Sequence, residues 1–231
     1  MAALHASLES PILRLLKRLL RPFRPWLAPI WFRLRDVADR LATLDLARRP
    51  IRPIRRAEFE SMVEEFPYYK NRWGYMSAAL GEAGRLIKDR DLTSALELGA
   101  PVRPILVGAH VMDNTMRPEY DTSVPATTHD ATAVPWPFAD KAFDLFIALQ
   151  VFEHLKDRQP EAFREVRRIA RHAILSLPID WVMDDPRNCH HMISEERVLS
   201  WFDPVVPTRV IENLTGRRKR LIYVFEDLPA P

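Results

Sequence analysis

The sequence predicts an α/β fold, built as a doubly wound, mainly parallel sheet with an antiparallel last strand and an N-terminal helical extension. From residue 93 onward, apolar runs of strand length alternate with amphipathic segments, which is typical of parallel strands joined by crossover helices. The last two candidate strands, 205–211 and 221–225, are joined by a short connection around Thr215 and Gly216. Such a connection requires the two strands to be antiparallel.

The clearest strand–helix–strand unit lies between residues 130 and 178. An apolar run at 143–152 has strand length, the polar pair Glu153 and His154 follows, an amphipathic helix is expected at about 160–171, and a second strand at 173–177. Ligand sites in open α/β sheets lie at the carboxyl ends of strands. His154 is therefore a candidate site residue.

The other elements are predicted from hydrophobic periodicity and from residues that interrupt regular structure, such as glycine and proline. Helices are expected at 57–66 and 75–89, on either side of an aromatic-rich stretch at 66–75 that we interpret as packing. Strands are expected at 93–98, ending at Gly99, and near 105–113, where Gly108 weakens the pattern. Residues 114–142 read as irregular, 179–193 as a polar loop, and 194–202 as a short helix with a capping pattern.

The charge is concentrated at one end of the chain. Residues 1–60 contain 13 Lys and Arg against 6 Asp and Glu, whereas the remainder contains 21 against 25. Residues 10–24 have a leucine-rich stripe opposite a cationic face, a second helix is expected at about 29–48, and the Pro/Arg stretch 48–56 resembles a linker. We therefore divide the chain into an extension, 1–56, and an α/β domain, 57–231.

The basic extension has three interpretations. A basic amphipathic helix at 10–24 fits an anionic membrane surface. It also fits a protein partner, or simple packing of its apolar stripe on the core. We expect no nucleic-acid role, since no recognised binding motif accompanies the charge. The oligomeric state is left open.

Composition indicates a reducing compartment. The single cysteine, Cys189, excludes an intramolecular disulfide, no apolar run reaches the ~20 residues of a membrane-spanning helix, and the N-terminal apolar residues are interrupted by basic ones. We expect a cytoplasmic protein, with peripheral association at the inner membrane face as an option. Cys189 is a potential nucleophile beside His190 and His191, but an incidental loop cysteine is the favoured interpretation.

Five segments of the chain carry a family resemblance. They are ALELGAPVRP at 95–104, HVMDN at 110–114, HDATAVPWPF at 129–138, FDLFIALQVFEHL at 143–155, and FREVRRIARHAILSLP at 163–178. Together, within residues 94–202, they resemble the class I S-adenosylmethionine-dependent methyltransferases, which have a Rossmann-like fold. The similarity is greatest to the branch acting on small molecules and sugars.

The resemblance implies a set of cofactor-binding residues. Glu97 and Gly99 match the acidic residue and the glycine turn of the first strand, Asp113 the ribose-binding acidic residue, and Asp130 with Ala131 the adenine edge. Gln150, at the end of the fourth strand, completes the set. The alternative for Asp113 and Asp130 is an ordinary loop or cap role, which aspartate often takes.

The first turn departs from the family pattern. Of its usual three glycines only Gly99 remains, and Pro101 removes an amide donor. The methionine part of S-adenosylmethionine carries no phosphate, so a strict phosphate cradle is not required, and some sugar-modifying members resemble this chain in having a reduced loop. The alternative hypothesis is a non-catalytic methyltransferase-like module that acts as a binding or scaffold protein.

Methyl transfer to a hydroxyl needs alignment of donor and acceptor and a general base. Histidine is the usual base near neutral pH, and the candidates are His154, His190 and His191. Asp184 and Asp185, in the same loop as the last two, are candidates to orient a histidine or hold a divalent cation, but their spacing matches no tight site and we expect no metal. The expected acceptor is a small molecule or a glycan, including a lipid-linked one.

Overall fold

The computed structural model describes residues 45–100, 102–116, 121–215 and 218–231. The chain forms two compact units, Met1–Arg48 and Arg49–Pro231. The amphipathic segment 10–24 and most of the second expected helix lie outside the described residues. The second unit contains both of the described sheets.

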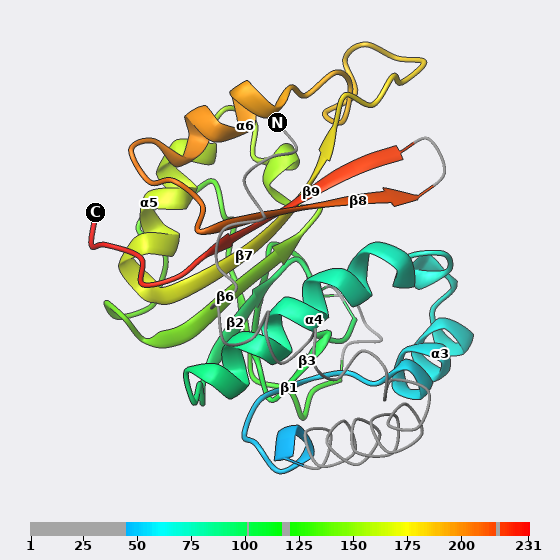
Figure 1. Ribbon diagram of the computed structural model, residues 1–231, viewed down its shortest axis with the longest axis vertical. Coiled ribbons are helices and arrows are strands. Elements are labelled where there is room, and N and C mark those ends of the chain that lie inside the picture. Colours follow the sequence, from blue (N-terminus) through cyan, green and yellow to red (C-terminus); the bar gives the residue numbers. More distant parts are fainter. Residues whose placement is uncertain (1–44, 101, 117–120, 216–217) are drawn as a thin grey trace, which may run out of the picture. The chain divides into compact units, whose positions relative to one another are not determined.

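This unit contains the helices and strands labelled in Figure 1. In chain order the elements are β1 (Arg52–Pro53), α3 (Arg56–Glu65), η2 (Pro67–Tyr69), α4 (Trp73–Asp89), β2 (Ala95–Leu98), β3 (Leu106–Val107), β4 (His110–Asp113), β5 (Ala126–Thr128), β6 (Phe143–Leu149), η3 (Phe152–His154), α5 (Gln159–Ile169), β7 (Ala170–Ile179), α6 (Glu195–Phe202), β8 (Arg209–Thr215) and β9 (Arg218–Phe225). No helix among these described residues is long and apolar enough to cross a membrane.

The main sheet has seven strands in the order β5-β4-β2-β6-β7-β9-β8. The strands from β5 to β7 are parallel, while β9 is antiparallel to both β7 and β8. The predicted α/β class with an antiparallel last strand is thus confirmed. Because β9 returns beside β7, its first residues lie at the same edge of the sheet as the carboxyl ends of the parallel strands.

Three strand expectations need correction. The strand expected at 105–113 is split into β3 and β4 at Gly108, which has φ of +82° and whose Cβ, if present, would lie 2.1 Å from the carbonyl oxygen of Pro50. Only glycine combines that conformation with such a close backbone approach. The short strand β5 lies inside the stretch expected to be irregular, and β8 begins at Arg209 rather than at residue 205.

Residues 49–56 pack as part of the α/β unit. Ile51 is buried, β1 pairs with β3, and Arg52 forms a bidentate ion pair with Glu58 of α3. Their Pro/Arg composition resembles a linker, but the two isoleucines within it supply apolar contacts that composition alone does not reveal. The compact unit therefore begins at Arg49, earlier than the boundary expected at residue 57.

The core lies on both faces of the sheet. Figure 1 shows α4 on one face and α5 with α6 on the other. Beneath α5 and α6, the rings of Phe163, Phe202 and Phe225 lie within about 5 Å of one another, with centroid distances of 4.8, 5.0 and 5.1 Å. Ser194 caps α6 by accepting a hydrogen bond from the Arg197 amide at 3.2 Å, as the capping pattern predicted.

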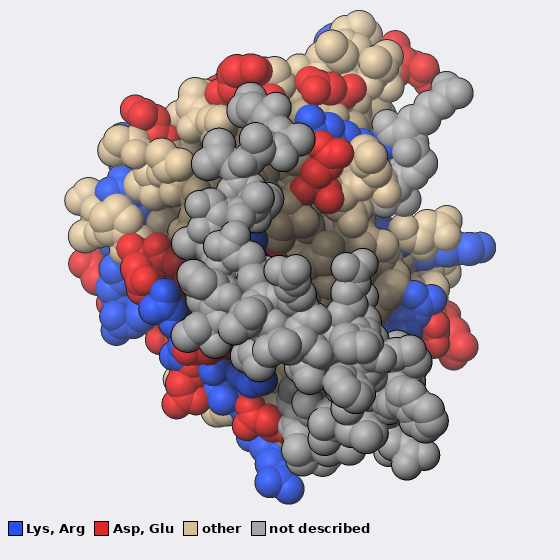
Figure 2. Space-filling model, viewed as in Figure 1, with Lys and Arg blue, Asp and Glu red and all other residues tan. Residues whose placement is uncertain are grey.

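Few helices cover the first strands of the sheet. Among the described residues, the connections from β2 to β4, from β4 to β5 and from β5 to β6 contain no helix. The loop after β5 packs instead through Trp136, which is 2% exposed and donates its indole N–H to the Ala131 carbonyl. On the face drawn in Figure 2, the described basic and acidic side chains are interspersed.

Candidate functional site

The residues singled out from the sequence follow the carboxyl ends of adjacent strands. Gly99 follows β2, Asp113 ends β4, Asp130 follows β5 and Gln150 follows β6. The strand order places these four ends side by side, and the loop after β7 adds Cys189 and His190 at the same edge. This is the edge at which open α/β sheets bind ligands.

Glu97 has a structural role in the first turn. Its side chain is buried, and Oε2 accepts hydrogen bonds from the backbone amides of Ile105 and Leu106 at 2.8 and 3.1 Å. Burial raises the pKa of this carboxyl to about 8, although the two amide bonds act in the opposite direction. Glu97 therefore holds the segment between β2 and β3 in place through hydrogen bonds to its backbone.

Gly99 is required by both conformation and space. Its φ is +83°, and a Cβ at this position would lie 2.4 Å from Cγ2 of Val151. Its amide donates to the Met112 carbonyl of β4 at 3.0 Å, which fixes the turn against the neighbouring strand. Ala100 and Val102 are buried after it, so the reduced turn is packed with small apolar side chains.

The two aspartates lie at the carboxyl ends of neighbouring strands, Asp113 as the last residue of β4 and Asp130 two residues after β5. Asp113 pairs in register with Thr128, and its carbonyl accepts the His129 amide at 2.9 Å, so Asp130 lies one residue beyond this contact. Asp130 is exposed and its Oδ1 accepts from the Thr132 amide and hydroxyl, at 2.9 and 2.8 Å. Those bonds hold the pKa of the Asp130 carboxyl below its usual value. The other carboxylate oxygen of Asp130, Oδ2, can still accept a hydrogen bond from a ligand.

Gln150 connects β6 to the last hairpin. Its φ is +59°, and its backbone N–H donates to the Ser176 carbonyl. Its side-chain Oε1 accepts a hydrogen bond from Nε of Arg220 at 3.2 Å. The Arg220 guanidinium lies 4.5 Å from the ring centroids of both Tyr75 and Trp181. Arg220 was not identified as a site residue from the sequence. It reaches the carboxyl-end edge of the parallel strands only because β9 runs antiparallel to β7. Ala131 is buried, with its carbonyl bound by Trp136.

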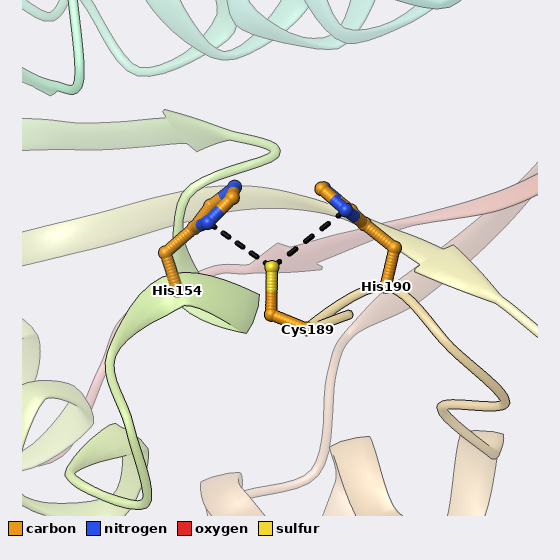
Figure 3. Close-up of side chains that lie close together, drawn as sticks. All are labelled: His154, Cys189 and His190. Atoms are coloured by element: carbon orange, nitrogen blue, oxygen red, sulfur yellow. Dashed lines mark hydrogen bonds between the residues drawn. The ribbon is translucent and has the colours of Figure 1, made fainter. Parts of the chain in front are cut away.

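His154 and His190 meet across the site, with Cys189 between them. Figure 3 shows the sulfur between the two imidazole rings, His154 coming from η3 and the other two residues from the loop after β7. Sγ lies 3.2 Å from Nδ1 of His154 and 3.6 Å from Nδ1 of His190, and the rings are 4.9 Å apart at their centroids. The cysteine that the sequence favoured as incidental is thus central to this cluster.

Glu153 supports the same cluster from below. Its carboxylate is fully buried, and Oε1 lies 3.4 Å from Nε2 of His190. Burial lowers the pKa of His154 and raises the pKa of the Cys189 thiol, in each case by penalising the charged form. A neutral imidazole and a protonated thiol are therefore favoured when no ligand is bound.

Two further candidates from the sequence, His191 and Asp185, lie apart from the cluster, and the aromatic stretch 66–75 packs nearby. Nδ1 of His191 faces the Met183 backbone, at 3.1 Å from its nitrogen, and Asp185 pairs with Arg187. Tyr69 is buried, with its hydroxyl 3.4 Å from the Arg103 carbonyl, so its ring is part of the packing. Arg72 donates to the Tyr75 hydroxyl at 3.2 Å, close to Arg220.

Comparisons with known proteins identify the fold. A family model described as a methyltransferase domain matches residues 108–173, the stretch from Gly108 through β4, β5, β6 and α5 into β7. The N-methyltransferase NodS from Bradyrhizobium japonicum WM9 aligns with 70% of this chain and 99% of its own, at 13% identity and a TM-score of 0.51. The fold is that of class I methyltransferases.

Other solved structures resemble the chain less closely. An S-adenosylmethionine-dependent methyltransferase from Aquifex aeolicus is 14% identical, covering 61% of this chain and 88% of that one, with a TM-score of 0.42. The (4+2)-cyclase SpnF is 10% identical, covering 59% and 76%, with a TM-score of 0.46. The comparison with curated proteins gave no match.

Proposed function

We propose that this protein transfers a methyl group from S-adenosylmethionine to an oxygen or nitrogen of a small-molecule or glycan acceptor, lipid-linked acceptors included. The observation that carries the proposal is the methyltransferase-domain match at residues 108–173. That stretch holds Asp113, Asp130, Gln150 and His154, which lie at or after the carboxyl ends of β4, β5 and β6, with β2 between β4 and β6 in the sheet.

The residues at this edge fit the cofactor. Asp113 would bind the ribose hydroxyls, while Asp130 and the Ala131 backbone would meet the adenine edge. Gly99 gives the turn after β2 the positive φ that it requires, and the space beside its Cα is filled by Val151. Gln150, held by Arg220, would face the methionine end.

The residues after β6 and β7 would handle the acceptor. When bound, the cofactor supplies an activated methyl group on a sulfonium, and the methyl's bond to sulfur breaks as its bond to the acceptor forms. Burial lowers the pKa of His154, so its imidazole is neutral near pH 7 and able to take the proton that the acceptor loses. His190 and His191 are the alternative bases in the facing loop.

Calorimetry with the full chain tests the cofactor assignment. Titration with S-adenosylhomocysteine and S-adenosylmethionine should give saturable binding near one ligand per chain. A folded sample that binds neither at millimolar concentration would exclude the enzymatic proposal. It would favour a non-catalytic module instead, an alternative motivated by the buried Ala100 and Val102 and by the Val151 side chain against Gly99.

Two aspartates with the same local structure give a matched pair for the adenine-edge role. Asp121 accepts from the amide and hydroxyl of Ser123, as Asp130 does from Thr132. We expect Asp130→Ala to weaken S-adenosylhomocysteine binding about tenfold, since a charged hydrogen bond is lost. Asp121→Ala should leave the affinity unchanged while losing the same local bonds. Equal affinities in the two variants would remove Asp130 from the site.

The basic segment 10–24 is proposed to bind an anionic membrane surface. We expect the full chain to co-sediment with vesicles containing phosphatidylserine but not with phosphatidylcholine vesicles. Changing Arg14, Lys17, Arg18 and Arg21 to Gln should abolish this binding, because each basic residue near such a surface contributes about 1 kcal/mol. Equal partitioning of the variant and the wild type would contradict the membrane proposal.

A further inference from the structure

We propose that His154, Cys189 and His190 form a binding site for a divalent transition-metal ion, with zinc as the preferred ion. The sequence alone predicts no metal, because the spacing of residues 184–191 matches no tight site. The site becomes visible only in three dimensions, since His154 comes from the loop region after β6 and its two partners from the loop after β7.

The distances among the three side chains suit one ion. One ligand atom from each residue can be chosen so that all three lie within 4.8 Å of one another. A tetrahedral zinc ion holds a thiolate sulfur and an imidazole nitrogen about 3.6 Å apart at its usual bond lengths. The corresponding separations from Cys189 Sγ are 3.2 Å to His154 and 3.6 Å to His190. His154 and Cys189 are exposed, and His190 is half-buried.

The buried carboxylate of Glu153 is the independent observation that points to a cation. Its side chain has no exposed surface, and neither of its oxygens has a hydrogen-bond partner among the described residues. A buried carboxylate without hydrogen bonds is costly, and nearby positive charge, to which Arg220 contributes, stabilises it. Its Oε1 is 3.4 Å from Nε2 of His190, while Nδ1 of the same ring faces Cys189.

The 3.4 Å approach of His190 to Glu153 is not a hydrogen bond as it stands, but a small shift on metal binding would make it a carboxylate–histidine pair of the kind that supports metal ligands. A histidine that donates one ring N–H to a carboxylate keeps its other nitrogen unprotonated and oriented toward the ion. Nδ1 of His190 lies 2.9 Å from Oδ1 of Asn188, a contact that ligation through Nδ1 would replace. The Cys189 thiol loses its proton to solvent on binding, because the thiolate is the ligand form.

The donor set selects the class of ion. One thiolate and two imidazoles suit zinc and other borderline transition metals, whereas magnesium and calcium require oxygen ligands. Three protein ligands leave a fourth position open, as in catalytic zinc sites. A pocket of about 240 Å³, bordered by Glu153, Cys189 and Trp201, adjoins the cluster and gives access to it. Ligation uses the nitrogen of His154, so this histidine can act as a base only without the ion.

Metal analysis of the full chain tests the proposal independently of methyl transfer. After chelation and dialysis against zinc, we expect one equivalent of zinc per wild-type chain by mass spectrometry. Cobalt in its place should give a thiolate-to-metal charge-transfer band and the visible bands of a tetrahedral ion. Cys189→Ser should abolish the charge-transfer band and lose the bound metal. Glu153→Gln should weaken zinc affinity about 10- to 100-fold.

A control variant separates this site from general binding to histidines. His129→Gln changes a histidine whose ring contacts the Ala133 carbonyl, outside the cluster, and should keep the zinc equivalent. Circular dichroism confirms that each variant is folded before metal is measured. Sub-stoichiometric zinc in the wild type, or an unchanged cobalt spectrum in Cys189→Ser, would overturn the proposal. Failure of S-adenosylhomocysteine to bind would not, since the two measurements are separate.

Discussion

Gly99→Ala is expected to destabilise the protein by roughly 2–5 kcal/mol and to abolish cofactor binding in whatever fraction remains folded. An L-residue in the left-handed region costs about 1–2 kcal/mol, and overpacking a filled site typically costs about 1–3 kcal/mol more. Both apply here, because Gly99 has a φ of +83° and its Cβ would meet Val151 at 2.4 Å. Chemical denaturation and calorimetry with S-adenosylhomocysteine measure the two effects.

Two further variants separate the causes of that loss. Val151→Ala removes the side-chain atoms in the way, so the double variant Gly99→Ala/Val151→Ala should lose less stability than the sum of the single changes. The destabilisation that comes from the left-handed backbone conformation at position 99 should remain in the double variant. Gly81→Ala is the matched control, because nothing lies within 4 Å of a Cβ there and alanine favours its helix. Simple additivity would contradict the close approach of Val151.

Glu97→Gln is expected to remove a pH dependence of stability. The folded-state pKa of this carboxyl is about 8 against an ordinary 4.5, with burial as the cause, so the folded protein holds the proton more tightly. The resulting stability is fully present below pH 4.5 and is lost as the pH rises toward about 8. Over that window the wild type should lose on the order of a few kcal/mol relative to Glu97→Gln.

The glutamine variant isolates ionisation because it keeps the acceptor. Both amide bonds go to one oxygen, Oε2, and a carboxamide oxygen can accept them equally. Free energies of unfolding measured in urea from pH 5 to pH 8.5 should therefore diverge, with the variant the more stable at high pH. Glu64→Gln, on the exposed side of α3, should follow the wild type. Parallel curves for Glu97→Gln and the wild type would show that the carboxyl does not resist ionisation.

Local patterns predicted the parallel part of the fold well. The apolar run before Glu153, the amphipathic segment after it and the next run became β6, α5 and β7, because burial on both faces and helical periodicity are properties of short segments. The domain boundary at Arg49 and the short strand β5 were harder to predict from the sequence. Strand β5 has three residues with mixed exposure, so it carries neither an alternating nor a continuous apolar pattern. Its pairing with β4 defines it.

The candidate site was predictable in part. His154 was assigned from the end of an expected strand, and the family resemblance assigned Gly99, Asp113 and Asp130; the strand order places all four at one edge of the sheet. Arg220 and Cys189 were not assigned. Arg220 depends on the antiparallel return of β9, and the role of Cys189 depends on its distance to a histidine 35 residues away.

The sequence by itself determined most of the strands and helices, among them β6, α5 and β7, because periodicity and turn chemistry act over a few residues. The tertiary structure alone decided which loop faces which strand end. It set Val151 against Gly99, enclosed the Glu153 carboxylate, and joined His154 to Cys189 and His190. Those contacts depend on packing between segments that are distant in the sequence. Such packing decides which titratable groups are buried, and burial in turn shifts their pKa values.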